Sequence, residues 1–398
     1  NTTADGNSAF GREALFSNTT GANNVAVGNG ALYYNTTADN NTALGSNALL
    51  LNTTGTQNVA VGHDALEANT TANNNTAIGF EAMKANTTGS FNTASGLVSL
   101  ASNTTGSENT AYGYRSLTSN TTASNNTAVG AGCLDLCTTG TSNTAVGTNA
   151  LDAVTTANNN TAVGKDALTA NTNQGNTAVG MAALEANTTG EQNTAVGMQS
   201  MDTCTTGIFN TAVGNLALNS LTTGNQNSAI GRDAGGSVTT GSNNTFLGQD
   251  AGKSNSPSGT VSTANNIVVL GNNNVNALYC ADTSISSSDS RDKTDITDFT
   301  NGLNWVNQLK PVTYRWDKRS WYNDNTPDGS KKRNKKHIGF LAQDVLAIEG
   351  NPTDKNDMFV VNLNEDDTAY GLKYERLVPV LVNAIKELSA KVAALEAG

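Results

Sequence analysis

One short polar segment of the sequence holds residue types that could cut a peptide bond. Ser288, Asp289, Arg291 and Lys293 lie within six residues of one another. A serine hydroxyl becomes a nucleophile when a base takes its proton, and a lysine amine can be that base where burial or a nearby cation favours its neutral form. Ser288 could then attack the carbonyl of Ser287. The residues alone leave a second interpretation open, a polar hairpin with capping side chains.

Other reactive residue types are too scattered to form a second site. His63 and His337 have no partner at metal-ligand spacing, and we expect neither a metal nor a cofactor. Acidic residues two positions after a repeated glycine form no close pair, which argues against a glycan-cleaving enzyme. The cysteines are too few for a disulfide scaffold: Cys133, Cys137, Cys204 and Cys280.

The design of the chain changes near residue 287. Residues 1–287 hold 6 Lys/Arg and 16 Asp/Glu, whereas residues 288–398 hold 16 and 17. The net charge of −11 argues against nucleic acid as a partner. No apolar run approaches the length of a membrane span, so we expect no membrane insertion. The low charge of the first part and the higher charge of the second predict separate domains.

A 17-residue repeat fills the first part. A pentad resembling Asn-Thr-Ala-Val-Gly ends at fifteen glycines from Gly11 to Gly248, with one 16-residue step from Gly164 to Gly180. Asn always stands four positions before this glycine, and a small residue and then usually Leu stand three and four positions after it. Alternating small and larger side chains, bounded by Gly and polar turns, favour one short strand per copy. We therefore predict a parallel β-solenoid over residues 1–254, with the repeated Asn as a hydrogen-bonded ladder.

The composition of the coil also suggests how copies would assemble. Its apolar residues are mostly Ala, Val and Leu, so we expect a thin coil that packs in threes and buries the Leu column and one strand face between copies. The repeat resembles the head β-rolls of trimeric autotransporter adhesins and the stalks of phage tail fibres.

Cys137 and Cys204 replace an Asn that precedes the repeated Thr-Thr pair, and we expect them to be small substitutes in that column. Pro257 ends the repeat, and residues 255–287 form a connector with one last strand near Asn266–Gly271.

Four motifs follow one another in the last 111 residues. They are Ser-Asp-x-Arg-x-Lys at 288–293, Leu-x-Pro-Val-x-Tyr-x-Trp at 309–316, Gly-Phe-x-Ala-Gln-Asp-Val at 339–345, and Tyr-x-x-Leu at 374–377. Residues 288–398 resemble the self-cleaving intramolecular chaperone of endosialidase-type phage tail spikes and fibres. The resemblance implies a small α+β domain that cleaves the chain between Ser287 and Ser288. It makes Ser288 the nucleophile and Lys293 the base, supported by Asp289 and Arg291, with no activity on external substrates.

The last helix is predicted to assemble the chain. Apolar residues at 3-4 spacing predict a coiled coil over residues 377–396. They are Val378, Leu381, Ile385, Leu388, Val392 and Leu395. Trimerisation through this helix would hold three shafts in register while they fold, because non-local β pairing is slow.

Together these patterns predict a mainly β protein, a trimeric solenoid followed by a chaperone domain. We expect a homotrimeric viral fibre, from a phage tail, that attaches to a glycan or protein receptor on the host surface and belongs to the virion. Other virion proteins would bind a region that precedes this sequence. A bacterial trimeric adhesin and an ice-binding solenoid are the alternatives.

The basic run Lys331–Lys336 fits a solvated loop tip, an anionic contact or a localisation signal.

Overall fold

The computed structural model describes residues 4–275, 293–322, 324–364 and 369–397. These residues form two compact units. The first comprises residues 1–253 with 262–270, and the second comprises residues 254–261 with 271–398. The first unit is called the shaft below, and residues 293–397 of the second are called the chaperone domain.

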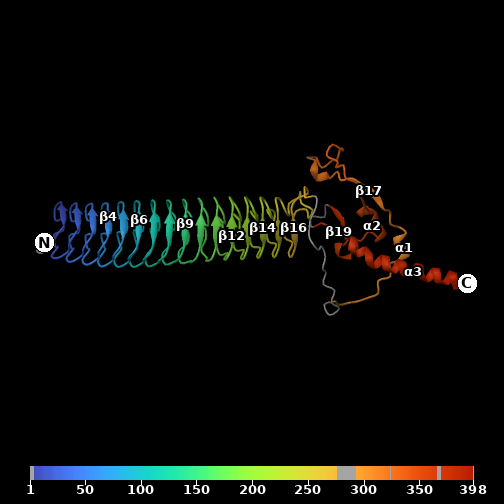
Figure 1. Ribbon diagram of the computed structural model, residues 1–398, viewed down its shortest axis with the longest axis horizontal. Coiled ribbons are helices and arrows are strands. Elements are labelled where there is room, and N and C mark those ends of the chain that lie inside the picture. The colour runs from blue at the N-terminus through green and yellow to red at the C-terminus, as the bar shows by residue number, and fades with distance from the viewer. Residues whose placement is uncertain (1–3, 276–292, 323, 365–368, 398) are drawn as a thin grey trace. The chain divides into compact units, whose positions relative to one another are not determined.

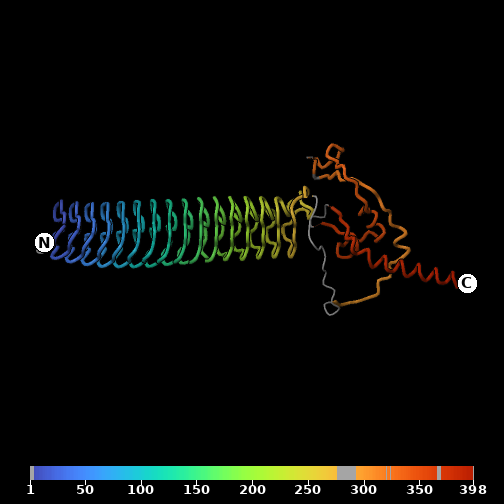
Figure 2. The backbone as a smooth tube through the Cα atoms, viewed as in Figure 1, coloured from blue at the N-terminus to red at the C-terminus, as the bar shows by residue number. Residues whose placement is uncertain are grey.

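The shaft is a single parallel sheet of sixteen short strands in sequence order. Each strand has three residues and pairs in register with the next, so that Ala77 lies between Ala60 and Ala94. Successive turns of the backbone follow the same path (Figures 1 and 2). The predicted parallel solenoid with 17-residue coils is confirmed. The strands are β1 (Ser8–Phe10), β2 (Val25–Val27), β3 (Thr42–Leu44), β4 (Val59–Val61), β5 (Thr76–Ile78), β6 (Thr93–Ser95), β7 (Thr110–Tyr112), β8 (Thr127–Val129), β9 (Thr144–Val146), β10 (Thr161–Val163), β11 (Thr177–Val179), β12 (Thr194–Val196), β13 (Thr211–Val213), β14 (Ser228–Ile230), β15 (Thr245–Leu247) and β16 (Val268–Leu270).

The Leu column lies inside the coil. Leu66 and its neighbour Met83 are fully buried within one chain, as is the strand alanine Ala77. The expectation that copies would have to pack together to bury the Leu column is therefore wrong. The cause is a tight corner after each strand, in which Asp64 (φ 55°) and Leu66 (φ 51°) adopt left-handed backbone conformations and turn the leucine inward.

The glycine that ends each pentad is required by close stacking of coils. Gly62 has a φ of 138°, and a Cβ built on it would lie 2.3 Å from the carbonyl oxygen of Gly79 in the next coil. Real side chains do not tolerate either condition. This explains why the repeat keeps Gly at this position in all fifteen copies.

Two asparagine ladders run along the shaft. In the first, the backbone N–H of Asn41 donates to Oδ1 of Asn24 at 2.9 Å, and the Asn41 side-chain amide donates to the carbonyl of Gly55. This is the predicted ladder, although most of its bonds join side chains to backbone. The second ladder precedes the Thr-Thr pairs and joins amide to amide, as from Asn35 Nδ2 to Asn18 Oδ1 at 2.9 Å. Both ladders satisfy polar groups that the coil buries.

The chaperone domain is a small α+β unit, as predicted. It contains two antiparallel pairs, β17 with β18 and β19 with β20, and the second pair packs with the helices around one apolar cluster. That cluster contains Trp305, Val345, Met358, Val360, Val361, Leu377 and Val380. The elements are α1 (Leu303–Val306), β17 (Val312–Tyr314), η2 (Arg319–Trp321), β18 (His337–Gly339), α2 (Ala342–Ile348), η3 (Lys355–Asp357), β19 (Val361–Leu363), β20 (Tyr370–Leu372), η4 (Tyr374–Arg376) and α3 (Leu377–Ala397).

Candidate self-cleavage site

The predicted nucleophile and the bond it would cut lie outside the described residues. Ser287, Ser288, Asp289 and Arg291 all fall within residues 276–292. Lys293 is the first residue described after that segment, and it is exposed. The pairing of Ser288 with Lys293 therefore stays a prediction. The structure describes the domain that begins at Lys293 and that would have to support the reaction.

Two of the recognised motifs form one antiparallel pair. β17 belongs to the Leu-x-Pro-Val-x-Tyr-x-Trp motif and β18 leads into the Gly-Phe motif, with Val312 opposite Gly339 and Tyr314 opposite His337. The Tyr314 ring stacks on His337 with centroids 5.5 Å apart. Burial raises the pKa of Tyr314, and the nearby Tyr374 raises it further, so the phenol stays neutral. His337 thus belongs to aromatic packing.

Tyr374 joins the closing motif to the Gly-Phe motif. Its hydroxyl accepts a hydrogen bond from the backbone N–H of Phe340 at 3.1 Å, and its ring stacks on the Phe340 ring at 6.1 Å. Phe340 lies between β18 and α2, so this bond fixes the approach to α2. Two motifs separated by 34 residues are therefore parts of one structure.

A glutamate at the end of α2 anchors the second antiparallel pair. Oε1 of Glu349 accepts from the backbone N–H groups of Val360 at 2.6 Å and Val361 at 3.3 Å. Oε2 accepts from the N–H of Phe359 at 3.3 Å. A carboxylate that receives three backbone donors holds the chain more firmly than a neutral acceptor would. Glu349 therefore fixes the start of β19 against α2.

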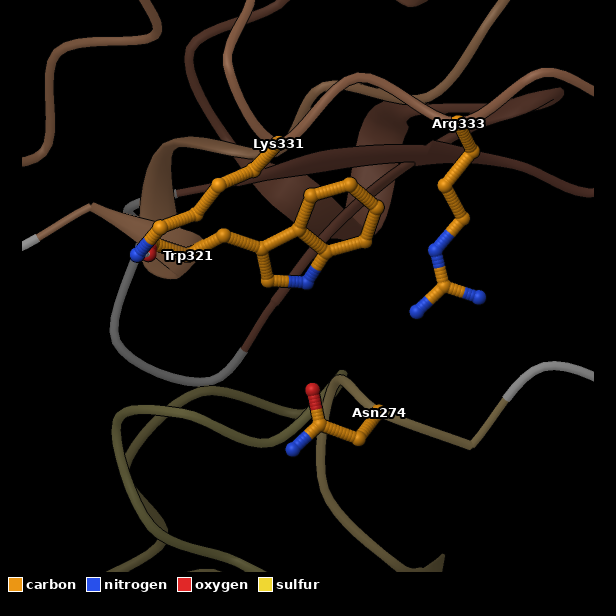
Figure 3. Close-up of a pocket in the computed structure, with 4 residues that line it drawn as sticks. All are labelled: Asn274, Trp321, Lys331 and Arg333. Atoms are coloured by element: carbon orange, nitrogen blue, oxygen red, sulfur yellow. Dashed lines mark hydrogen bonds between the residues drawn. The ribbon is translucent and has the colours of Figure 1, made fainter.

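The basic run packs partly on aromatic rings. The guanidinium of Arg333 lies 4.6 Å from the centre of the Trp321 ring, and the Lys331 amine donates to the Trp321 carbonyl (Figure 3). Lys318 lies over Trp316 at 5.1 Å, and burial lowers the pKa of Lys318, with a further contribution from Arg333. Lys331 and Lys332 remain exposed. The charge of this run is evident from the sequence, but the aromatic residues beneath it become neighbours only in the folded domain.

The described cysteines are poor candidates for chemistry. Cys133, Cys137 and Cys204 are free and buried in the shaft. Burial raises the pKa of Cys133 to about 12 and that of Cys137 and of Cys204 to about 11. Their thiols therefore stay protonated and unreactive near neutral pH.

The C-terminal part of the chain matches a known protein family. Residues 288–353 match the family model described as the chaperone of endosialidase. The predicted resemblance is confirmed over these residues, and with it the general character of the region, an autoproteolytic chaperone of tail-fibre-like proteins. Neither the search of curated proteins nor that of solved structures found a match.

Among the described residues, no three His, Cys, Asp or Glu side chains are arranged to hold a metal ion. No helix in this part of the chain is long and apolar enough to span a membrane.

Proposed function

We propose that this chain is a homotrimeric phage tail fibre whose C-terminal chaperone assembles the shaft and then cuts itself off between Ser287 and Ser288. The observation that carries the proposal is the chaperone match at residues 288–353, directly after the connector that follows a solenoid of fifteen repeats. The shaft would attach to a glycan or protein on the host surface, and the mature protein would reside in the virion.

The exposed face of α3 supports assembly of three copies. Leu377, Val380 and Ala384 are buried against the domain, whereas the predicted coiled-coil positions face away from it. Their exposed fractions range from 43% at Leu381 to 82% at Leu395. Such a continuous apolar stripe on a helix is normally covered by a partner. The other members are Val378, Ile385, Leu388 and Val392.

A second apolar stripe on the shaft supports the same assembly. The residue before each repeated glycine, apolar in every copy except Ser95, is at least partly exposed, with Phe10 78% exposed, Tyr112 57% and Ile230 50%. This stripe repeats once per coil. A partner can cover this stripe along its whole length only if its own residues repeat at the same spacing from coil to coil. Further copies of the shaft have that spacing.

In the proposed reaction, Lys293 takes the proton of the Ser288 hydroxyl while Oγ attacks the carbonyl carbon of Ser287. The peptide C–N bond breaks, Lys293 delivers the proton to the released amine of Ser288, and an ester joins Ser287 to Ser288 Oγ. Water then hydrolyses the ester. It leaves a carboxylate on Ser287 and restores the Ser288 hydroxyl.

The cut is tested by expressing the full chain as wild type, Ser288→Ala and Lys293→Ala, with Ser290→Ala as the matched control. We expect the wild type and the control to release a fragment whose first residue is Ser288, and the other two variants to stay whole. A wild type that stays whole, or a Ser288→Ala chain that is still cut, would refute the assignment. Sedimentation equilibrium of the purified shaft tests the trimer.

A further inference from the structure

The segment that follows the cleavage motif is held on α3. The side-chain amide of Asn383 donates to the carbonyl of Phe299 at 2.6 Å and to that of Asn301 at 3.3 Å. Oε2 of Glu387 accepts from the backbone N–H of Leu303 at 3.2 Å. These contacts lie entirely within the chaperone domain and join residues that are 82 to 84 positions apart.

The contact at Glu387 depends on a glycine. A Cβ built on Gly302 would lie 1.9 Å from Oε1 of Glu387 and 3.3 Å from the backbone nitrogen of Ala384. A side chain at position 302 would therefore displace the Glu387 carboxylate and crowd the backbone of α3 at Ala384. The backbone at 299–303 and the Asn383–Glu387 edge of α3 fit each other closely because no side chain separates them.

Apart from its bond to Leu303, Glu387 lies in a part of α3 that its own domain does not bury. Ala384 is the last buried residue of the helix, and every residue from Ile385 to Ala397 is exposed. A helical stretch this short is marginally stable in water without packing. With 100° per residue, Asn383 and Glu387 lie on roughly the opposite side of α3 from Ile385 and Leu388. Partners that cover the apolar stripe would therefore order the helix and leave these two polar side chains in contact with segment 299–303.

The same segment leads directly from the predicted base. Phe299 follows Lys293 by six residues, a stretch that spans at most about 20 Å. Fixing Phe299 and Leu303 on α3 therefore keeps Lys293 within about 20 Å of Phe299, whereas release of the segment would let it move further away. Placement of the base matters because a misplacement of about 1 Å can slow a reaction on the order of a hundredfold.

We propose that Asn383 and Glu387 are positioning residues for self-cleavage, which hold the segment after Lys293 in place once assembly has ordered α3. This inference rests on the proposed function, since it assigns these residues to the proposed cut. They do not touch the reacting atoms. They act through the backbone of residues 299–303.

The experiment follows cleavage over time in the full chain carrying Asn383→Ala, Glu387→Ala or Glu387→Gln. Glu396→Ala on the same helix is the matched control. Alanine favours a helix, so the variants keep α3. We expect Asn383→Ala and Glu387→Ala to form trimers by sedimentation but to cleave on the order of tenfold more slowly. Glu387→Gln keeps an oxygen acceptor for the Leu303 N–H and should recover most of the rate.

The outcomes separate this inference from the function it rests on. Wild-type cleavage with wild-type rates in both alanine variants would overturn the positioning role and leave the proposed function standing. Loss of the trimer together with cleavage in Glu387→Ala, without recovery in Glu387→Gln, would show a structural role and also overturn it. A wild type that never cleaves would overturn the proposed function itself.

Discussion

Asn120 Oδ1 is buried and has no hydrogen-bond partner, because Cys137 stands where the next rung of the second asparagine ladder would be. The amide of Asn120 still donates to Asn103 at 2.7 Å, so the ladder continues up to Asn120 and ends there. The Cys137 thiol replaces only the local bond, to the carbonyl of Gly140 at 3.4 Å. Asn187 is in the same position below Cys204, and its Oδ1 is also unpartnered. The two cysteines fit the ladder column in size but interrupt its hydrogen bonding.

Restoring the rung should stabilise the shaft. Cys137→Asn would add a side-chain amide that donates to Asn120 Oδ1. The Oδ1 of the introduced side chain would then be the buried acceptor without a partner, one coil further along. One more buried hydrogen bond is worth about 1 kcal/mol, so we expect the unfolding free energy of the shaft to rise by that amount. Cys133→Ser is the control, because serine occupies the equivalent position in other coils and should change little.

The opposite change in the middle of the ladder should be costly. Asn69 donates to Asn52 Oδ1 at 2.9 Å and accepts from Asn86 at 3.0 Å. Asn69→Ala leaves the buried Asn52 Oδ1 without a donor and leaves the Asn86 amide with only its bond to the Gly89 carbonyl, so we expect a loss of about 2–3 kcal/mol in denaturant unfolding. Equal stability of Asn69→Ala and wild type would mean that the ladder contributes nothing net.

The 17-residue repeat correctly predicted the strands of the shaft, but it did not predict the backbone conformation of the corners that follow them. Alternation at Thr76-Ala77-Ile78 is a strand pattern with a small residue at the buried position, and the structure contains that strand. Hydropathy also predicted that Leu66 would be buried, but it cannot distinguish burial inside the coil from burial between copies of the chain. The answer depends on the left-handed backbone at Leu66, which leucine disfavours in isolation and which only the stacked coils stabilise.

The candidate site was predictable only where its residues are close in sequence. The Ser288–Lys293 motif is local, and so is the apolar spacing along α3. The contacts of Asn383 and Glu387 with residues 299–303 join the two ends of the chaperone domain and depend on its tertiary fold. No local pattern marks a polar helix residue as one that holds a distant backbone segment.

A pair of stacked carboxyl groups should make the shaft more stable in acid. Asp135 is 9% exposed and pairs with Arg115 at 2.7 Å through Oδ2, whereas its Oδ1 is buried without a partner. Asp152 occupies the same position in the next coil. Burial raises the pKa of Asp152 above its ordinary value of 3.8, and the charge of Asp135 raises it further, while Arg115 lowers it. The folded state therefore holds a proton on Asp152 to a higher pH than the unfolded chain does.

The sign of the effect follows from that difference. The stabilisation is fully present below pH 3.8 and is lost as pH rises through the native pKa of Asp152. Asp152→Asn mimics the neutral acid and can donate to Asp135 Oδ1. We expect its melting temperature to match the wild type near pH 3.5 and to exceed it by about 2 °C at pH 8.

Glu108→Gln is the control for the acid pair, because Glu108 is an exposed single carboxylate and Gln occupies its position in other coils. Subtracting its difference from wild type at each pH separates the effect of Asp152→Asn from the general effect of replacing a carboxylate by an amide. A difference between Asp152→Asn and wild type that is constant over this range would contradict the role of Asp152.

A charge on the apolar stripe of α3 should prevent assembly. Leu388 is 51% exposed in the single chain and would be covered in the proposed trimer. Leu388→Lys would bury an unpaired ammonium there, which costs more than the contact it replaces. We expect sedimentation equilibrium of the full chain to show monomers. We also expect little cleavage, because α3 would not be ordered. Ala393→Lys places the same charge about 140° around the helix from Leu388 and away from Glu387, and should leave trimer and cleavage intact. A Leu388→Lys chain that still forms trimers would place the assembly contacts elsewhere, on the stripe of the shaft.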